Sequence, residues 1–265
     1  MKIGFIGTGN MGAALARAVA KKKGDNKIFL ADFDRQKAQD LAEEINAVVS
    51  DNVSLILECD LVFLGVKPQV LDELMREIRP VVAKREKEIV LCSMAAGISL
   101  ATLEAGLGEV ALIRIMPNMP VAVGEGVIVY CTRRTDSETE RAFAELLSEG
   151  GCVEKIEETK IDAASALHGC GPAFVYLFIE ALADGAVSCG LTREQAIRFA
   201  AATVKGAAET VLVDGRHPAA LKDAVCSPGG TTIEGVKTLE ELGFRGATID
   251  AVRAAYEKTV KLGQK

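Results

Sequence analysis

Tryptophan is absent from the sequence, and phenylalanine and tyrosine together supply only 5% of its residues. Proteins that bind single-stranded nucleic acid use aromatic side chains as stacking platforms, and this chain has few to offer. It also lacks a basic block, and its net charge of −6 at pH 7 disfavours nucleic acid and anionic membrane surfaces as partners. The composition therefore favours a small-molecule substrate or ligand.

Signals for export or membrane insertion are also lacking. The apolar run at the start is broken by glycines and no cleavage-site pattern follows it, so no secretory signal is predicted. No stretch approaches the ~20 apolar residues that a membrane helix requires, so no membrane partner is expected. The seven cysteines are scattered without a CxxC pair, as is typical of reduced thiols, and we expect a cytoplasmic protein.

The composition that is present is that of a globular protein with a sizeable core: 265 residues, 49% hydrophobic and 26% charged. Over residues 1–158 short β-rich runs alternate with helical patterns. This alternation predicts an α/β, Rossmann-type domain with a doubly wound parallel sheet that binds a dinucleotide. The predicted strands are 2–6, 27–31, 61–66, 88–93, 110–115 and 126–131, and the predicted helices are 10–22 and 35–45.

From residue 159 to residue 265 the strand pattern disappears, and we predict an all-α domain for substrate binding and dimerisation. The helix 172–190 is apolar on nearly every face and should be buried all round. The other helices are too few to cover it, so we predict a homodimer through this domain; burial within one subunit is the alternative. The predicted helices are 160–167, 172–190, 193–213, 217–226, 231–242 and 246–262.

A glycine loop follows the first strand and opens the first helix. A strand, a tight turn and a helix N-terminus in this order form the context in which backbone N–H groups bind the pyrophosphate of NADH or NADPH. The motif is short, and a glycine-rich turn in an unrelated α/β protein is the alternative. The loop residues are Gly7, Thr8, Gly9, Asn10, Met11 and Gly12.

Two acids follow the second predicted strand. Asp32 lies 20 residues after Gly12, the spacing at which an acid accepts the ribose hydroxyl groups of NAD. With Asp34 it would repel the 2′-phosphate of NADPH, whereas Arg35 and Lys37 could turn toward that phosphate. We therefore expect use of NADH with NADPH tolerated. The competing interpretation is that Asp32 only caps the following helix.

Further segments follow other predicted strands and should meet at the same crevice, because ligands bind outside the carboxyl ends of parallel strands. Lys67 could contact a phosphate or merely face solvent. Asn118 stands between two prolines in a turn that is either structural or a wall beside the nicotinamide. The residues predicted to bind cofactor here are Val66, Lys67, Pro68, Ala95 and Asn118.

A second glycine turn, CSPGGTTIEG at 226–235, precedes the predicted helix 231–242. Thr231 as N-cap, with Glu234 three residues later, predicts a capping box. Gly229 and Gly230 carry no side chain, so backbone N–H groups at the positive end of the helix are accessible. These features predict a second anion site, and an ordinary loop with a helix cap is the alternative.

Several segments are similar to a known family: FIGTGNMG (5–12), GVKPQ (65–69), MAAGIS (94–99), RIMPNMP (114–120), HGCGPAF (168–174), EALADGAVSCGL (180–191) and HPAALKDAVCSPGGTTIEGVKTLE (217–240). Over essentially its whole length the chain resembles the pyrroline-5-carboxylate reductases. The resemblance implies reduction of (S)-1-pyrroline-5-carboxylate to L-proline with NADH or NADPH, the last step of proline synthesis. It also implies a helical domain that interlocks into dimers, often assembled into decamers. His168 and Cys170 depart from the small hydroxyl residues that the family commonly has there.

The resemblance gives the second glycine turn a ligand. We predict that the N–H groups of Gly230, Thr231 and Thr232 bind the substrate carboxylate beside Gly229. The resemblance places the hydroxyl of Thr232, as the catalytic contact, near the ring nitrogen and makes Val225 part of the pocket lining. A protonated imine is already an electrophile, so no strong acid is needed, and the sequence has no cluster with metal-ligand spacing.

Two other functions are compatible with parts of this pattern. A β-hydroxyacid dehydrogenase also pairs a Rossmann domain with a helical domain, and it would need a catalytic lysine on a helix of the second domain. The candidates are Lys205, Lys222 and Lys237, none of which has the glycine-rich context of that family. A nucleotide-sensing dimer without enzymatic activity would bind cofactor without turnover.

Overall fold

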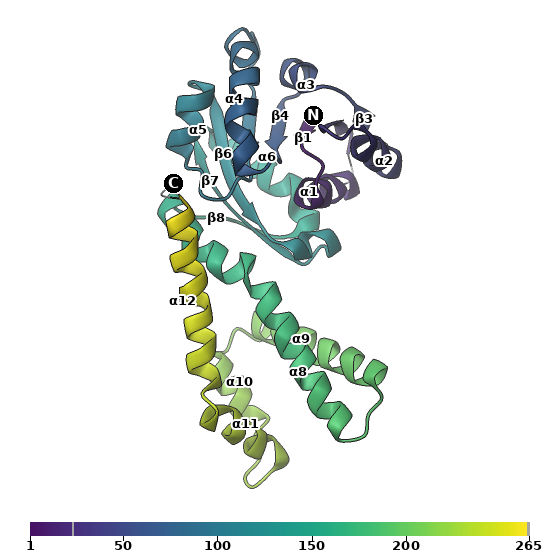
Figure 1. Ribbon diagram of the computed structural model, residues 1–265, viewed down its shortest axis with the longest axis vertical. Helices are drawn as coiled ribbons and strands as arrows, with labels where there is room; N and C mark the ends of the chain where they lie inside the picture. The colour runs from purple at the N-terminus through teal and green to yellow at the C-terminus, as the bar shows by residue number, and fades with distance from the viewer. Residues whose placement is uncertain (23, 264–265) are drawn as a thin grey trace. The chain divides into compact units, whose positions relative to one another are not determined.

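The computed structural model, which describes residues 1–22 and 24–263, contains an eight-stranded sheet in the first part of the chain (Figure 1). The strands lie in the order β3-β2-β1-β4-β5-β6-β7-β8. The first six places repeat the order 3-2-1-4-5-6 of dinucleotide-binding folds. The strands are β1 Lys2–Ile6, β2 Lys27–Ala31, β3 Val48–Val49, β4 Leu61–Leu64, β5 Val90–Ser93, β6 Ala111–Pro117, β7 Gly126–Arg133 and β8 Gly151–Lys155.

Helices connect these strands. All the strands and helices predicted for this part of the chain are present within a few residues of their predicted ends. Neither β3 nor β8 is predicted from the sequence, since β3 has two residues and β8 (GCVEK) contains no continuous apolar run. The helices are α1 Asn10–Lys21, α2 Arg35–Ile45, α3 Asn52–Glu58, α4 Pro68–Ala83, α5 Leu100–Leu107 and α6 Ser137–Leu146.

The far end of the sheet is not parallel as predicted. β7 pairs antiparallel with β6, with Ile115 opposite Tyr130, and β8 runs parallel to β7. Only the short turn 118–125 joins β6 to β7. A parallel connection needs a crossover of about a dozen residues or more, so this turn permits only the antiparallel pairing. The sheet is therefore mixed and mostly parallel.

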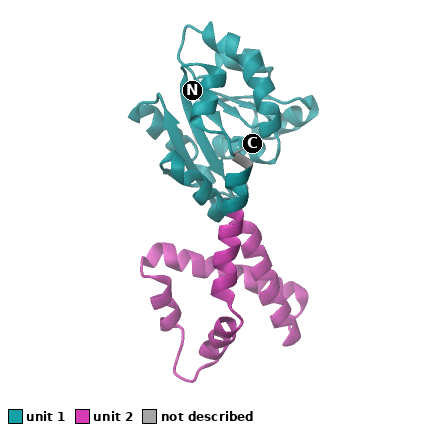
Figure 2. Cartoon of the chain, turned by 60° about the vertical axis from the view of Figure 1, so that its left-hand side comes forward, with its two compact units in different colours: residues 1–169, 256–265 teal, residues 170–255 magenta. Residues whose placement is uncertain are grey.

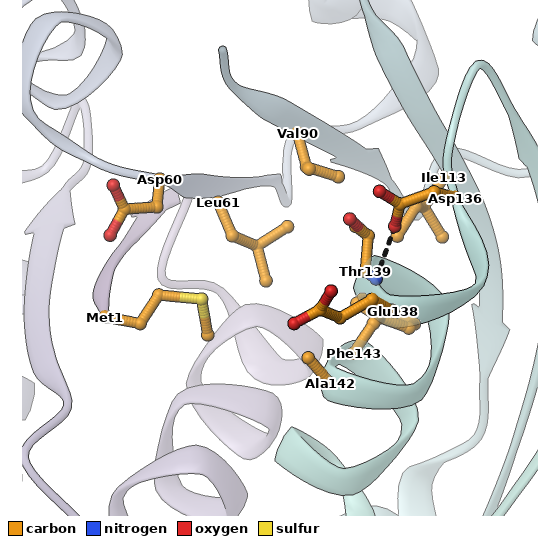
Figure 3. Close-up of a pocket in the computed structure, with 10 residues that line it drawn as sticks. All are labelled: Met1, Asp60, Leu61, Val90, Ile113, Asp136, Glu138, Thr139, Ala142 and Phe143. Carbon is orange, nitrogen blue, oxygen red and sulfur yellow. Dashed lines mark hydrogen bonds between the residues drawn. The ribbon is translucent and has the colours of Figure 1, made fainter. Parts of the chain in front are cut away.

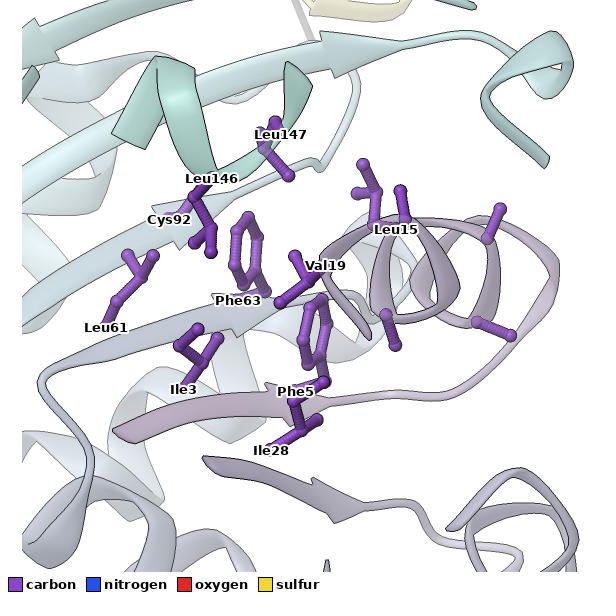
Figure 4. Close-up of a cluster of buried hydrophobic side chains, with 14 of the residues drawn as sticks. Ile3, Phe5, Leu15, Val19, Ile28, Leu61, Phe63, Cys92, Leu146 and Leu147 are labelled. Atoms are coloured by element: carbon purple, nitrogen blue, oxygen red, sulfur yellow. The ribbon is translucent and has the colours of Figure 1, made fainter. Parts of the chain in front are cut away.

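Both faces of the sheet are buried, which explains the continuous apolar runs in the sequence. Alternate residues of one strand reach opposite faces: in β4, Phe63 packs with α1, α2 and α6, whereas Val62 and Leu64 pack with α3, α4 and α5. Figure 4 shows the first of these clusters. There the rings of Phe5 and Phe63 stack with centroids 4.6 Å apart, and Phe63 in turn lies 6.0 Å from Phe143 of α6.

After β8 the chain is helical. By contacts within the chain, one compact unit comprises Met1–Gly169 with the end of the chain from Tyr256, and the other is Cys170–Ala255 (Figure 2). A capping box begins α9, with the side chains of Thr192 and Gln195 both engaged. The helices are α7 Ile161–Ala164, α8 Gly171–Ser188, α9 Arg193–Asp214, α10 Pro218–Ala224, α11 Thr231–Glu241 and α12 Phe244–Gly263, with a π-helical turn, Ser165–Gly169, between α7 and α8.

The second unit has almost no core of its own. Its buried apolar cluster consists of Ala183, Ala196 and Ala200, and Ala183 is the one buried residue of α8. The alternative that α8 is buried within one subunit is therefore wrong. The helix is as apolar as its sequence predicts, and it presents that surface outward.

The apolar surface also corrects one expectation from the sequence. Within the described residues, the helical run Glu158–Ser188 is long and apolar enough to cross a membrane by length and composition alone, and 6% of its most apolar window is buried. The expectation that no stretch approaches that length is wrong by this measure. A helix whose apolar surface is covered by a partner subunit is likewise apolar in composition and little buried within its own chain.

Glu140 joins three segments at the outer end of the sheet. Its Oε1 atom accepts hydrogen bonds from Thr132 Oγ1 at 2.6 Å, Thr135 Oγ1 at 2.9 Å and Lys155 Nζ at 2.7 Å. Burial by itself would raise the pKa of Glu140, but these three donors outweigh it and hold the pKa below its usual value of 4.5. A depressed carboxyl pKa stabilises the fold at pH values above the unfolded pKa.

We expect Glu140→Gln to lower the free energy of unfolding by about 1–2 kcal/mol at pH 7, because a charged acceptor of three hydrogen bonds is lost. The stabilising effect of the carboxylate is lost as the pH falls through the folded pKa, so the difference from the unsubstituted chain should shrink below about pH 4. Urea unfolding at pH 7 and pH 3.5 measures it. Glu154→Gln, an exposed position on the neighbouring β8, is the matched control. An equal deficit at both pH values would contradict the carboxylate as the cause.

Candidate active site

The glycine loop crosses the end of β4 at a distance that no side chain permits. Gly7 has φ +96°, and a Cβ atom there would lie 2.7 Å from the carbonyl oxygen of Gly65, at the end of β4. A Cβ atom on Gly12 would overlap the carbonyl oxygen of Gly7. The loop is also fixed to β2, since Gly7 N donates to Ala31 O at 2.7 Å. These glycines are required for the close packing of β1, α1 and β4.

Gly9 has a different environment. It is the N-cap of α1, its own conformation is extended, and no side chain caps the helix. A Cβ atom on Gly9 would have nothing within 4 Å, and Gly9, Thr8 and Asn10 line a groove of about 440 Å³. The first N–H groups of a helix have no intrahelical acceptor. This end of α1 therefore fits the pyrophosphate of a dinucleotide, whereas Met11 is half-buried against the core.

Asp32 and Asp34 have separate roles. Asp32 Oδ2 accepts from both Thr8 N at 2.6 Å and Thr8 Oγ1 at 3.0 Å, and Asp32 Oδ1 accepts from Asp34 N at 2.9 Å. Asp34, not Asp32, caps α2 by accepting from Gln36 N. The interpretation that Asp32 only caps this helix is therefore wrong. Its carboxylate holds the glycine loop against the end of β2.

Three of the other predicted cofactor residues follow β4. Val66 is half-buried, Lys67 is the exposed N-cap of α4, and Pro68 is the first residue of that helix. Ala95, after β5, is buried, and its N–H donates to Ser93 Oγ at 3.3 Å. Because β1, β4 and β5 are parallel neighbours, these segments leave the sheet at the same edge as the glycine loop.

The side chain of Asn118 forms hydrogen bonds within the protein. Its Nδ2 atom donates to His168 O at 2.9 Å, and its Oδ1 atom accepts from Val127 N at 2.8 Å. The imidazole Nε2 of His168 is 2.8 Å from Met116 O. Asn118, 7% exposed, thus ties the turn after β6 to β7 and to the π-helical turn. A second role toward the cofactor stays a prediction.

In the second unit, the turn before α11 is built from Ser227 to Gly230. Gly230 N donates to Ser227 O at 3.0 Å across Pro228 and Gly229. Gly229 has φ +66°, the left-handed value that the third position of a type II turn requires. A Cβ atom on Gly230 would overlap Ser227 Oγ. Gly229 is therefore needed for the turn itself, whereas a side chain at Gly230 would displace the hydroxyl group of Ser227.

The N-cap of α11 is Gly230 and not Thr231 as predicted. Gly230 is extended, with φ −80° and ψ 171°, Thr231 is the first helical residue, and no side chain caps the helix. The predicted capping box of Thr231 and Glu234 is therefore wrong. The N–H group of Gly230 is also used in the turn, which leaves those of Thr231 and Thr232 for an anion. Val225, the C-cap of α10, is 66% exposed.

Two family models match the chain. Residues 2–97 match a model described as NADP oxidoreductase, coenzyme F420-dependent. Residues 158–262 match a model described as pyrroline-5-carboxylate reductase dimerisation. The first match covers the glycine loop in an NADP-binding domain, and the second covers the helices whose apolar surface is exposed.

Known proteins resemble the chain over its full length. Pyrroline-5-carboxylate reductase of Arabidopsis thaliana is 41% identical over 99% of this chain and 96% of its own length, and that of Methanosarcina acetivorans is 39% identical over 100% and 98%. The chain belongs to the pyrroline-5-carboxylate reductase family. The predicted enzyme, a pyrroline-5-carboxylate reductase of proline biosynthesis, is thereby confirmed. The β-hydroxyacid dehydrogenase and non-enzymatic alternatives are overturned.

Solved structures of the family have the same fold. A pyrroline-5-carboxylate reductase from Coxiella burnetii superposes with a TM-score of 0.91 at 30% identity and covers 98% of this chain and 97% of its own. The Plasmodium falciparum pyrroline carboxylate reductase, solved with NADP bound, has a TM-score of 0.84 at 32% identity and covers 99% and 98%. The predicted Rossmann-type domain followed by an all-α domain is confirmed.

The lysines considered for the dehydrogenase alternative make other contacts in the reductase. Lys222 pairs with Asp223 at 2.9 Å, and Lys237 lies 3.9 Å from Glu241 one helical turn away. Both carboxylates are on the same helix or at its end, so these are ordinary exposed pairs. Among the described residues, no group of three or more His, Cys, Asp or Glu side chains could hold a metal ion.

One charged cluster of the reductase is not predicted from the sequence. Arg114 of β6 is 4% exposed and pairs with Glu158 at 3.3 Å and Asp162 at 3.1 Å. Glu158 also accepts from Leu100 N, the first residue of α5, at 2.7 Å. The signal in the sequence is a single arginine in an otherwise apolar strand. The cluster fixes the start of the helical region to β6 and α5.

The buried cysteines are not candidates for catalysis. Burial raises the pKa of Cys59 and Cys131 to about 12, and it raises that of Cys92 well above its usual value. A thiol with so high a pKa carries almost no thiolate at neutral pH. These residues therefore act as small apolar groups of the core.

A separate cavity lies at the other edge of the sheet (Figure 3). It has a volume of about 280 Å³ and is lined by Met1, Asp60 and Val90, which lie at the amino ends of the parallel strands, and by residues of α6. The glycine loop leaves the carboxyl ends of the same strands. The cavity is therefore not part of the cofactor site.

Two glycine substitutions should separate packing from cofactor binding. In Gly9→Ala the methyl group enters open space, so we expect the free energy of unfolding to change by less than about 1 kcal/mol. The same methyl group obstructs the approach of a pyrophosphate to the backbone, and NADH affinity should fall at least about tenfold. In Gly12→Ala the methyl group overlaps Gly7 O, so stability should fall as well. Thermal melts and NADH titration measure both, and an unchanged NADH affinity in Gly9→Ala would contradict the assignment.

Proposed function

We propose that the reductase holds its two reactants at two helix N-termini that have no side-chain caps. The observation that carries the proposal is that α1 and α11 both begin at a glycine N-cap, Gly9 and Gly230, without a capping side chain. Asp or Ser side chains cap α2, α3, α5 and α6. The helices α4, α7 and α8 also lack a capping side chain, but their N-caps are Lys67, Lys160 and Cys170 and not glycine. An uncapped N-terminus leaves N–H groups and the positive end of the helix dipole for an anion.

At α1 the anion is the pyrophosphate of NADH or NADPH. The loop Gly7–Gly12 shapes the site, and the N–H groups at Asn10 and Met11 are the donors. Asp32 fixes the loop through Thr8. Segments after β4 and β5, including Lys67 and Ala95, complete the edge along which the dinucleotide lies.

At α11 the anion is the carboxylate of pyrroline-5-carboxylate. The N–H groups of Thr231 and Thr232 bind it, while Gly229 and Gly230 form the turn that presents them. Val225, exposed at the end of α10, lines the same pocket. Because N–H groups hold the carboxylate, the ring of the substrate is positioned without a charged side chain.

Reduction of the imine requires little acid–base catalysis from the protein. The dinucleotide supplies the hydride when it is bound. The imine nitrogen gains one proton and its carbon gains the hydride, so a C=N bond becomes the C–N bond of L-proline. The hydroxyl of Thr232 contacts the ring nitrogen and orients it, because a hydroxyl can either donate or accept a hydrogen bond.

We propose that NADH is preferred and NADPH is tolerated. The carboxylate of Asp34 lies at the end of β2, where a 2′-phosphate would approach, and it would repel that phosphate. Lys37 Nζ is 3.6 Å from Asp34 Oδ2. This lysine therefore pairs with Asp34 and partly offsets the repulsion between Asp34 and a 2′-phosphate. Arg35, the first residue of α2, is a cation that can still reach one.

The proposed assembly is a homodimer formed through the region 158–262. The exposed apolar side chains of α8 and α9 support it, because a surface this apolar is ordinarily covered in a stable protein. A decamer of five dimers remains a proposal from the resemblance, and so does a cytoplasmic location. The exposed apolar side chains of α8 and α9 are Val175, Tyr176, Leu177, Leu182, Ile197, Phe199, Val211, Leu212 and Val213.

Thr231→Pro should impair substrate binding selectively. Proline fits the first helical position, and Gly230 before it already has the extended conformation that a proline requires, so the helix should be kept. The substitution removes one N–H donor to a carboxylate, a bond worth about 1.5–3 kcal/mol, and the KM for pyrroline-5-carboxylate should rise roughly 10- to 100-fold. The NADH dissociation constant should stay within a factor of two. Steady-state assays and NADH titration measure the two effects.

Thr232→Val is the companion variant, since it keeps the N–H group and removes the hydroxyl. It should lower kcat more than it raises KM. Equal losses of substrate and cofactor binding in Thr231→Pro would indicate disturbed folding and overturn the carboxylate assignment. No proline formed by the unsubstituted chain with either NADH or NADPH would overturn the reaction itself.

Asp34→Ser should shift the choice of cofactor. Serine is as good an N-cap as aspartate, so α2 keeps its cap and loses one negative charge. We expect the NADPH dissociation constant to fall about 3- to 10-fold while that of NADH changes little. Asp32→Ala is the comparison: it releases Thr8 and should weaken both cofactors. If both cofactors respond equally to Asp34→Ser, the charge of Asp34 does not set the preference.

A further inference from the structure

Phe33 is the most exposed large apolar side chain among the described residues. The residue is fully open to solvent, at 108% of the reference exposure. A single exposed apolar residue is common on protein surfaces and needs no explanation by itself. The position of this one, between the two acids that follow β2, is what carries the inference.

The backbone on both sides of Phe33 is held by hydrogen bonds. Ala31 O accepts from Gly7 N at 2.7 Å, and Asp32 Oδ2 accepts from Thr8 N at 2.6 Å. On the other side, Asp34 N donates to Asp32 Oδ1 at 2.9 Å, and Asp34 caps α2. The ring is thus presented from a fixed segment that is tied directly to the glycine loop.

The ligand that approaches this segment is the adenosine half of a dinucleotide. When a pyrophosphate occupies the N-terminus of α1, the adenosine ribose lies beside the end of β2 in folds with this strand order. One glycosidic bond joins that ribose to a purine. Phe33 follows the residue at which the ribose is expected, so an unpartnered aromatic face lies where a flat aromatic base arrives.

Stacking is the interaction that this residue can provide. Phenylalanine has no hydrogen-bonding group and no charge, so it cannot bind a 2′-phosphate or a ribose hydroxyl group. Its face can stack on a purine, as aromatic side chains do on bases in other proteins. A ring held by a fixed backbone loses little freedom on binding, which favours affinity.

We propose that Phe33 is the stacking platform for the adenine ring of the cofactor. The inference rests on the proposed function only in that the chain binds a dinucleotide at the glycine loop. It gives Phe33 a role in affinity that is equal for NADH and NADPH, since the base is common to both. The choice between the two cofactors belongs to the neighbouring Asp34.

The absence of tryptophan makes a direct test available. Phe33→Trp introduces the single tryptophan of the chain, so all tryptophan emission comes from position 33. Titration with ADP-ribose, which carries the adenine but no nicotinamide, should quench that emission. Reduced nicotinamide mononucleotide lacks adenine and should not bind near position 33. Once the fluorescence is corrected for the absorption of this compound, it should cause no quenching.

Leu57→Trp is the matched control. Leu57 is 53% exposed on α3, and the next residue, Glu58, pairs with Lys2 at the amino edge of the sheet, away from the glycine loop. A tryptophan there should report no binding of ADP-ribose. Equal quenching at both positions, or no quenching at position 33 while ADP-ribose binds by calorimetry, would overturn the proposal.

A second variant measures the size of the effect. Phe33→Ala should weaken ADP-ribose and NADH binding roughly 5- to 150-fold, the range that corresponds to the loss of an aromatic partner by a base. Binding of reduced nicotinamide mononucleotide and the KM for pyrroline-5-carboxylate should not change, and the melting temperature should not fall. Unchanged ADP-ribose affinity would overturn the proposal. These titrations measure binding and involve no turnover. Failure of the chain to form proline would therefore overturn the proposed function, whereas the test of Phe33 would stand.

Discussion

The close approach of three glycines is the constraint on which the first unit depends. Gly7, Gly12 and Gly65 bring the turn after β1 into contact with the start of α1 and the end of β4, and a Cβ atom on any of them would meet a carbonyl oxygen. The same contact directs the N-terminus of α1 outward at Gly9, where space is open. Packing of the sheet and exposure of the anion site therefore have one cause.

Asp32 extends this constraint to β2. Its two carboxylate oxygens accept from Thr8 and from Asp34 N, so the glycine loop, the end of β2 and the start of α2 form one hydrogen-bonded segment. The acid that its spacing marks as a contact for ribose is thus also a structural brace of the loop. Such a brace keeps the N–H groups in place before a ligand arrives, which lowers the cost of binding.

The second unit, Cys170–Ala255, differs from the first in that it has little buried core of its own. Its helices are well formed and one has a complete capping box, but their buried core contains three alanines. Helices of this kind gain most of their stability from packing of apolar faces and not from propensity. The match of residues 158–262 to a dimerisation domain supplies the missing partner, since a second copy can cover the exposed apolar side chains. The membrane-like composition of the run Glu158–Ser188 has the same origin.

The sequence by itself determined the family, the strand–helix alternation, the glycine loop and the apolar nature of 172–190, because periodicity and motif spacing are local properties of the chain. It could not determine that Asp34 and not Asp32 caps α2, or that Gly230 and not Thr231 caps α11. A cap is defined by φ and ψ and by which N–H group faces a side chain, and two candidates one or two residues apart have the same pattern in sequence. The pairing of Arg114 with Glu158 and Asp162 likewise joins residues more than 40 positions apart. Only the tertiary structure decides such contacts, because they depend on how distant elements pack.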